Sequence, residues 1–389
     1  MKSNYKKLGD YIREVNIRNK DLQINNLIGV SMEKKFISSV ANMVDVDISV
    51  YKIIEKGQFA CKLMSVGRDE KLPIDLYRNE EKAIVSSAYY VFEVIDKSIL
   101  LDEFLLMWLS RPENDRYIGY ISGGDVRGGI SWDVFCEIPI KIPDIIKQQE
   151  IVDEYNAIKN RISLNNSLIE KLEETAKSIY KEWFVDFEFP DENGKPYKSS
   201  GGEMEFCSEL EKEVPKGWKV WRLNEIAIIK AGGDRPFLYS PEKTVDCSIP
   251  IYANGIINDG LYGFTNKANY PKNSITVSAR GNIGYSVLRY EPFDAIVRLL
   301  VIMPKEEYFG IYIWQTIRKT DFDLSGSVQS QLTIPQISIL KVLLPDLKVL
   351  KDYDNLLKII YKNSYKKLKE NENLGKMKDL ILSKMASES

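Results

Sequence analysis

The chain contains an internal repeat, so its fold must accommodate two copies of one structural unit. A displacement of 202 residues aligns GGDVRGGISWDVFCEIPIKIPD, which begins at Gly123, with SGSVQSQLTIPQISILKVLLPD, which begins at Ser325. The same displacement carries Glu170 onto Glu372, so the register holds over more than fifty residues. A repeat of this length predicts two similar domains in tandem.

Each copy also shows the same order of predicted elements. Residues 7–12 resemble residues 222–227 at a displacement of 215, so the copies differ by insertions between their fixed ends. The hydrophobic patterns predict strands in 83–95 and a helix in 101–110 for the first copy, and strands in 295–303 and a helix in 308–319 for the second. A glycine-containing loop and a final strand that ends at proline close each copy. We therefore predict an α+β fold with two tandem domains.

A seven-residue periodicity follows each copy. Such a pattern is typical of the seam of a coiled coil, in which a single polar residue can fix the register. The second series is rougher, because Lys367 and Lys378 interrupt it. The predicted seam consists of Ile151, Tyr155, Ile158, Ile162, Asn165, Ile169, Leu172, Ala176, Ile179 and Trp183 in the first helix, and Leu357, Ile360, Leu374 and Ile381 in the second.

The two helices are predicted to pair with each other. A helix over 151–183 would be about 50 Å long, which exceeds the width of a small domain. Antiparallel pairing would make the helices a spacer between the domains, with an approximate two-fold axis. The alternative is that each amphipathic helix packs only on its own domain. The predicted boundaries are 1–144 for the first domain, 145–186 for the central helix, 187–213 for an acidic linker, 214–345 for the second domain and 346–389 for the C-terminal helix.

The composition excludes several kinds of enzyme. The chain has no histidine, which removes Ser-His-Asp, Cys-His and His-metal chemistry. It also lacks a phosphate-binding loop, a dinucleotide-binding glycine motif and an Asn-Pro-Pro-Tyr-like tetrapeptide. Its four cysteines lie far apart without a Cys-x-x-Cys pair, and no apolar stretch reaches the length of a membrane span. We expect a cytoplasmic protein that is not itself a catalyst and binds no metal or cofactor.

The charge distribution is compatible with nucleic-acid binding but does not by itself indicate it. The whole chain has 54 basic and 56 acidic residues. Residues 214–345 hold 15 basic and 11 acidic residues, whereas residues 187–213 hold 3 and 8. Residues 1–144 hold 20 basic and 22 acidic residues, so any basic face in the first domain must arise from the spatial arrangement of its side chains.

Glycine-rich turns in both copies carry side chains suited to reading base edges. Arginine, asparagine, glutamine and tyrosine on loops can hydrogen-bond to bases, while lysines neutralise phosphates. Each residue alone has an ordinary interpretation as a solvated charge or a turn former. The candidate DNA-binding residues are Lys62, Arg68, Lys71, Arg78 and Arg127 in the first copy, and Arg235, Tyr252, Asn254, Lys267, Arg280, Asn282, Gln329 and Gln331 in the second.

Three segments resemble the specificity subunits of type I restriction-modification systems. Residues 214–226 (VPKGWKVWRLNEI) look like the family's entry into a target-recognition domain, and residues 176–187 (AKSIYKEWFVDF) like the end of its central helix. Residues 140–152 (IKIPDIIKQQEIV) resemble its exit from a recognition domain. The second copy, LLPDLKVLKD at 343–352, lacks the glutamine pair, so its partner-binding surface need not match that of the first.

This resemblance implies a function in double-stranded DNA recognition. Each half would be a target-recognition domain that reads one part of a split, asymmetric site, and the helices would set the spacing. Two modification subunits carrying S-adenosylmethionine would methylate adenine, and restriction subunits driven by ATP, with magnesium, would cleave unmodified DNA in phage defence. Partner subunits would supply part of the phosphate contact.

Two other classes of function remain open from the residues alone. A two-headed protein scaffold could use the same loops to bind peptides. A carboxylate-dependent hydrolase could use Asp191 and Glu192 with Lys195, although this segment reads as a solvated turn.

Overall fold

The computed structural model describes residues 6–38, 47–64, 66–122, 128–322 and 331–388. The chain divides into two compact units, one formed by 1–165 with 369–389 and the other by 166–368. Two helices of 40 and 42 residues, α5 (Ile145–Phe184) and α9 (Leu347–Glu388), each contribute one part to each unit. The two units are described separately below.

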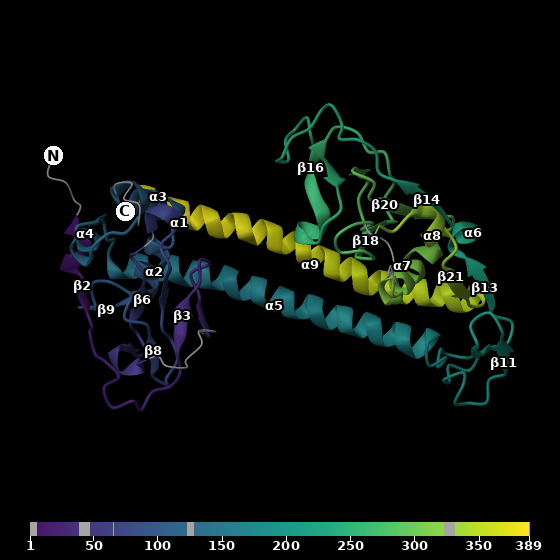
Figure 1. Ribbon diagram of the computed structural model, residues 1–389, viewed down its shortest axis with the longest axis horizontal. Helices are drawn as coiled ribbons and strands as arrows, with labels where there is room; N and C mark the ends of the chain where they lie inside the picture. Colours follow the sequence, from purple (N-terminus) through teal and green to yellow (C-terminus); the bar gives the residue numbers. More distant parts are fainter. Residues whose placement is uncertain (1–5, 39–46, 65, 123–127, 323–330, 389) are drawn as a thin grey trace. The chain divides into compact units, whose positions relative to one another are not determined.

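In its described residues, the first unit is built from short strands with four short helices before α5 (Figure 1). Its strands are β1 (Lys6–Lys7), β2 (Ile12–Glu14), β3 (Ile28–Val30), β4 (Phe36–Ser38), β5 (Lys52–Ile54), β6 (Phe59–Cys61), β7 (Ile74–Leu76), β8 (Ala83–Val85), β9 (Tyr90–Val94) and β10 (Pro139–Ile140). Its helices are α1 (Val66–Asp69), α2 (Asp102–Leu109), α3 (Pro112–Ile121) and α4 (Trp132–Cys136), with 3-10 turns at η1 (Leu8–Asp10) and η2 (Ile48–Val50).

The core of the first unit lies between its four-stranded sheet and α2. The sheet has the order β2-β9-β6-β7, and all its pairings are antiparallel. Phe59 and Phe92 stack on neighbouring strands with ring centroids 4.8 Å apart, and Phe104 of α2 is fully buried in the same cluster. Burial of these aromatic side chains supplies much of the hydrophobic stabilisation of the unit. The predicted strands in 83–95 and the predicted helix in 101–110 are confirmed.

The second unit repeats this arrangement with different insertions (Figure 1). Its strands are β11 (Met204–Cys207), β12 (Lys212–Pro215), β13 (Lys219–Arg222), β14 (Ala227–Ala231), β15 (Ile249–Tyr252), β16 (Leu261–Thr265), β17 (Ser274–Val277), β18 (Ser286–Arg289), β19 (Asp294–Ala295), β20 (Leu300–Pro304) and β21 (Lys341–Leu344). Its helices are α6 (Leu223–Ile226), α7 (Gly310–Lys319) and α8 (Ile334–Ser338), with 3-10 turns at η3 (Ile257–Gly260) and η4 (Glu307–Phe309).

The four-stranded sheets of the two units have the same topology. The order β14-β20-β17-β18 in the second unit matches β2-β9-β6-β7 in the first, with the same antiparallel pairings. In both units a helix comes after the strand of this sheet that is last in chain order: α2 after β9, and α7 after β20. A further strand then closes each unit against its start, in the pairs β1 with β10 and β13 with β21. The repeat seen in the sequence is therefore a repeat of the fold.

The segment predicted as an acidic linker is more ordered than a solvated loop. Residues 204–207 and 212–215 pair as the antiparallel hairpin β11–β12. Phe187 and Phe189 are buried, and Phe189 stacks on Trp218 with ring centroids 5.1 Å apart. Phe187 and Phe189 attach the segment to the core of the second unit, a role that its acidic composition did not indicate.

In the first unit the residues of the predicted seam lie where α5 and α9 run together. There the segments of α5 and α9 lie side by side in opposite chain directions (Figure 1). Arg161 forms an ion pair with Glu370, with Nε and Oε1 2.6 Å apart. Nearer the N-terminus of α5, Ile151 and Ile381 line the same cavity between the two helices. All the seam residues of this part of α5 are buried or half-buried: Ile151, Tyr155, Ile158, Ile162 and Asn165.

The seam also continues through the second unit. Trp183 of α5 contacts Tyr353 of α9, with ring centroids 5.7 Å apart. On α5, Ile169, Leu172, Ala176, Ile179 and Trp183 are buried or half-buried, as are Leu357 and Ile360 on α9. In both units the helices pack against each other and also on the neighbouring domain core. Pairing of the two helices and packing on a domain, which the sequence analysis treated as alternatives, therefore occur together.

A pair of asparagines occupies one level of the seam. Asn165 Nδ2 donates a hydrogen bond to Asn371 Oδ1 at 2.8 Å, and Asn165 is only 3% exposed. Asn371 was not predicted, although it lies fourteen residues after Leu357 and hence in the same heptad series. Lys367 and Lys378, which interrupt the apolar pattern, are half-buried at the expected seam positions. A buried polar pair of this kind favours one register over its neighbours.

Replacing Asn165 with leucine should lower the free energy of unfolding by about 1–3 kcal/mol, because Asn371 Oδ1 then loses the hydrogen bond from Asn165 in a partly buried seam. The double variant Asn165→Leu with Asn371→Leu should recover most or all of that loss. Urea unfolding of the wild type, both single variants and the double variant measures the coupling. Additive losses in the double variant would show that the two amides do not interact.

Candidate nucleic-acid interface

The two main candidate loops occupy equivalent places in the two units. The loop 62–73, which carries Lys62 and Lys71, joins β6 to β7, and the loop 278–285 joins β17 to β18. In the first unit Ile130 N donates to Leu63 O at 3.1 Å, and in the second Leu332 N donates to Ala279 O at 2.9 Å. One backbone hydrogen bond thus joins the loop to the glycine-containing segment in both copies.

The loop 278–285 is braced by Asn254 from a neighbouring turn. Asn254 Oδ1 accepts a hydrogen bond from the backbone N of Ala279 at 2.7 Å, and its Nδ2 donates to Val297 O at 2.9 Å. Its amide is thus already used within the protein, and Asn254 holds the loop in place. Gly281 follows with φ of +69°, a conformation that glycine adopts without strain.

Arg280 and Gln331 meet at the surface of this loop. Gln331 Oε1 accepts hydrogen bonds from Arg280 Nε at 3.1 Å and from Arg280 Nη2 at 2.8 Å. Arg280 is exposed and Gln331 is half-buried. The arginine is therefore held in one orientation while part of its guanidinium faces solvent.

Tyr252, on β15 of the second unit, is half-buried. The guanidinium of Arg289 lies 3.5 Å from the centroid of the Tyr252 ring, and Arg289 is only 6% exposed. Burial lowers the pKa of Arg289, whose Nη2 donates to Asp259 O and whose Nε donates to Thr276 Oγ1. Arg289 was not predicted, because nothing in its sequence context separates it from a surface charge on a strand.

Asn282 lines a hollow of about 400 Å³ together with Tyr285 and Arg318. Tyr285 donates from its hydroxyl to Asp259 Oδ1 at 2.6 Å. Burial, and then this hydrogen bond to Asp259, raise the pKa of Tyr285 to about 12. The hydroxyl is thus engaged by Asp259 at the edge of the hollow.

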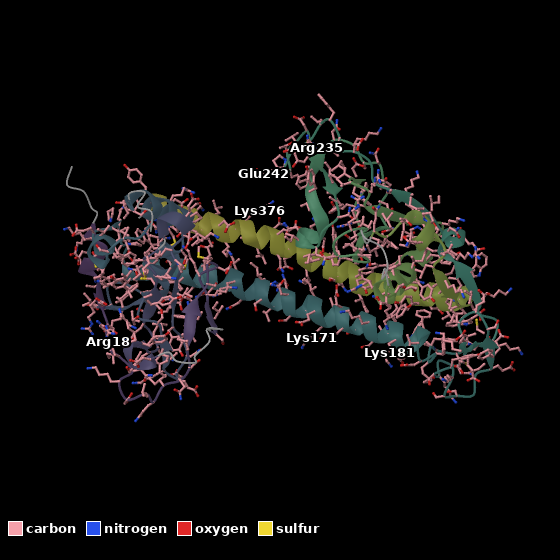
Figure 2. The ribbon with its side chains drawn as sticks, viewed as in Figure 1. Arg18, Lys171, Lys181, Arg235, Glu242 and Lys376 are labelled. Carbon is pink, nitrogen blue, oxygen red and sulfur yellow. The ribbon has the colours of Figure 1, made fainter. Side chains whose placement is uncertain are left out.

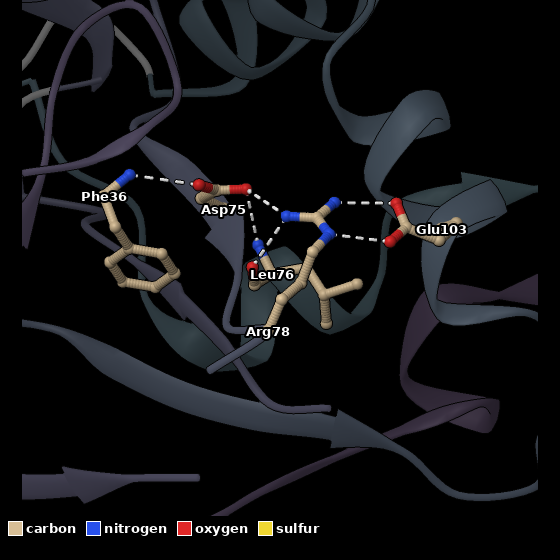
Figure 3. Close-up of polar contacts among 5 residues, drawn as sticks. All are labelled: Phe36, Asp75, Leu76, Arg78 and Glu103. Carbon is tan, nitrogen blue, oxygen red and sulfur yellow. Dashed lines mark hydrogen bonds and ion pairs between the residues drawn. The ribbon is translucent and has the colours of Figure 1, made fainter. Parts of the chain in front are cut away.

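In the first unit Arg78 makes a forked ion pair with Glu103 (Figure 3). Its Nε and Nη2 each donate to one carboxylate oxygen of Glu103 at 2.7 Å, and its Nη1 donates to Leu76 O at 2.9 Å. The hydrogen bonds to Glu103 raise the pKa of Arg78 further above its usual range. In this structure Arg78 fastens β7 to α2, so we give it a structural role beside its predicted contact with DNA.

The other candidate residues lie on the surface or outside the described residues. Arg235 is exposed, and its guanidinium lies 5.0 Å from the ring centroid of Tyr239 (Figure 2). Lys71 and Lys267 are exposed, and Lys62 is half-buried. Arg127, Gln329 and the side chain of Arg68 lie outside what the structure describes.

The acidic turn considered for a hydrolase is held by local hydrogen bonds. Asp191 Oδ1 accepts from the backbone N of Lys195 at 2.8 Å and from the backbone N of Asn193 at 2.7 Å. These bonds, that of Lys195 foremost, lower the pKa of Asp191. Its carboxylate shapes a turn, as the sequence indicated. In the described ranges no group of three or more cysteine and carboxylate side chains could hold a metal ion, and no helix there has the length and apolarity to cross a membrane.

The chain contains two copies of one α+β unit. In each copy a surface loop joins two strands of that unit's own four-stranded sheet, which is the arrangement of a tandem recognition protein. The family model described as type I restriction modification DNA specificity domain matches residues 74–174 and 215–385. The chain therefore belongs to the family of type I restriction-modification specificity subunits, as its sequence motifs indicated.

Individual relatives agree with this assignment. The HindI specificity subunit of Haemophilus influenzae is 21% identical, over 97% of this chain and 97% of that protein. The MjaIX specificity subunit of Methanocaldococcus jannaschii is 24% identical, over 75% of this chain and 70% of that protein. A crystal structure of a type I restriction-modification S subunit from M. genitalium has a TM-score of 0.63 at 14% identity, over 98% of this chain and 95% of that chain. This likeness confirms the predicted fold class.

Proposed function

We propose that each unit of this specificity subunit reads one half of a bipartite, asymmetric site in double-stranded DNA. The observation that carries the proposal is that equivalent loops, on sheets of the same topology, present different side chains in the two units. A repeated framework suits two readers that approach DNA in the same way. Different side chains on it suit two different half-sites.

The paired helices are proposed to set the spacing between the half-sites. Each is continuous over 40 or more residues, which corresponds to about 60 Å at 1.5 Å per residue. Both carry the seam through both units, and the Asn165–Asn371 pair favours one register. A spacer must resist sliding to hold a fixed distance, and a register-fixing polar pair has that effect.

Catalysis is assigned to partner subunits. Two modification subunits would dock around the helices and recognition domains and carry S-adenosylmethionine, and restriction subunits would use ATP and magnesium. This chain would bind no cofactor itself. The role of this chain would be to position the complex on one DNA sequence. The complex would act in the cytoplasm, where that DNA lies. Partner contacts with phosphates would compensate for the near-neutral charge of the chain.

Salt dependence separates this function from a protein scaffold that uses the same loops for peptides. The chain, purified with its cognate modification subunits, is titrated with duplex DNA at several salt concentrations. The logarithm of the binding constant should fall with the logarithm of salt concentration, with a slope near −0.9 for each phosphate contacted. A duplex with one half-site scrambled is the control and should bind more weakly. Equal binding of both duplexes, or no dependence on salt, would contradict the proposal.

A further inference from the structure

The Arg280–Gln331 pair differs from an ordinary surface contact in how it is supported. Arg280 directly follows Ala279, and Gln331 directly precedes Leu332, and the backbone hydrogen bond between Leu332 N and Ala279 O joins the two segments. Asn254 braces the same loop by accepting from Ala279 N at 2.7 Å. The backbones on both sides of the pair are therefore fixed, so little freedom remains for the Arg280 side chain to lose on binding.

The first unit places different side chains at the equivalent positions. There the backbone hydrogen bond joins Ile130 to Leu63, so Met64 corresponds to Arg280 and Gly129 to Gln331. Met64 is 57% exposed and has no strong hydrogen-bonding group, and Gly129 has no side chain. A Cβ added at Gly129 would lie 3.0 Å from Met64 O, so this place has little room for a glutamine. The forked pair is thus particular to the second unit.

The hydrogen bonds to Gln331 leave a defined set of donors on Arg280. Gln331 Oε1 takes the Nε and Nη2 side of the guanidinium. In a planar guanidinium, the end formed by Nη1 and the outer N–H of Nη2 then presents two parallel donors. This end matches the O6 and N7 acceptors of guanine in the major groove, the commonest specific contact of arginine with a base.

We propose that Arg280, positioned by Gln331, reads a guanine in the half-site bound by the second unit. The inference rests on the proposed function and adds a base identity to it. The first unit, with Met64 and Gly129 in these places, makes no such contact. This pair is then one physical source of the asymmetry between the half-sites.

Base analogues test the contact directly. Methylome sequencing of cells carrying the complete modification complex first gives the target, which should contain an invariant guanine in the second half-site. That guanine is then replaced in synthetic duplexes by 7-deazaguanine, which lacks N7, or by hypoxanthine, which keeps N7 and O6. Binding of the wild-type complex should weaken roughly 5- to 150-fold with 7-deazaguanine and change little with hypoxanthine.

Variants connect the effect to the two residues. Arg280→Ala should remove the difference between guanine and 7-deazaguanine and relax that single position in the methylome, while the first half-site stays unchanged. Gln331→Ala should reduce discrimination at the same position roughly 2- to 10-fold, and Gln331→Glu, which keeps the acceptor, should retain it. Lys267→Ala is the matched control, because loss of an exposed cation should weaken binding of all bases alike.

Some outcomes would overturn the assignment without touching the proposed function. They are a second half-site without an invariant guanine, equal binding of guanine and 7-deazaguanine, or an Arg280→Ala variant that weakens every sequence alike through a lost phosphate contact. In each case the complex would still bind its own target specifically. Absence of any specific binding by the wild-type complex would instead reject the proposed function.

Discussion

Replacing Tyr353 with alanine is expected to lower the free energy of unfolding by about 3–5 kcal/mol, as for other large aromatic residues removed from a core. Tyr353 on α9 is fully buried. Its ring lies 4.7 Å from that of Phe184 and 5.7 Å from that of Trp183, both on α5, measured between centroids. The side chain therefore joins the seam to the domain core of the second unit, and its loss would leave a cavity at that junction.

Tyr353→Phe is the matched control. Burial raises the pKa of Tyr353, and its hydroxyl has no hydrogen-bond partner among the described residues. Removing a buried hydroxyl without a partner should leave stability unchanged or slightly higher. Urea unfolding of both variants distinguishes the contributions of ring and hydroxyl. A loss for Tyr353→Phe as large as that for Tyr353→Ala would show that the hydroxyl, and not the packing of the ring, matters here.

The architecture could be predicted because it depends on patterns that the sequence displays directly. A constant displacement between copies implies a repeated fold, and the seven-residue periodicity implies a paired seam. Two details needed coordinates. Asn371 lies in the heptad series, but only the contact with Asn165 Nδ2 identifies it as the second member of a polar pair. The aromatic anchors of the 187–213 segment were masked by its acidic composition.

Gln148, one of the two glutamines that the second copy lacks, has a structural role in the first unit. Gln148 is fully buried at the start of α5. Its Oε1 accepts from Leu101 N at 2.9 Å, and its Nε2 donates to Ile99 O at 2.8 Å and to Pro143 O at 2.9 Å. At the same place in the repeat, Leu350 is buried in the apolar core of the second unit. The Gln148 side chain therefore holds the start of α5 to the segment that precedes α2. In the second copy the start of α9 is held instead by apolar packing of Leu350.

The candidate site was less predictable than the fold. Residue type and loop position indicated which segments face a ligand, but not which side chains remain available to it. Asn254 and Tyr252 have the residue types that suit base reading, yet Asn254 braces the neighbouring loop and Tyr252 lies against Arg289. Arg78 is paired with Glu103 in the same way. Such partners lie far away in the sequence, so only the folded chain shows them.

Removing one heptad from both helices is expected to shorten the DNA spacer that the complex prefers. Deleting residues 166–172 from α5 together with residues 364–370 from α9 removes matched segments next to the Asn165–Asn371 level, retains that pair and keeps the remaining seam in phase. Seven residues of helix correspond to about 10 Å. At 3.4 Å per base pair along one strand, the spacer should shrink by about three base pairs. Deleting the heptad from α5 alone is the control. It should move the seam residues of α5 out of register with those of α9 and so destabilise the protein.

Methylome sequencing of cells that carry the doubly shortened chain with its cognate modification subunits is the most direct test that paired helices fix the distance between two readers. We predict a methylated motif with both half-sites intact and a spacer about three base pairs shorter than that of the wild type. A motif with intact half-sites and an unchanged spacer would contradict the account.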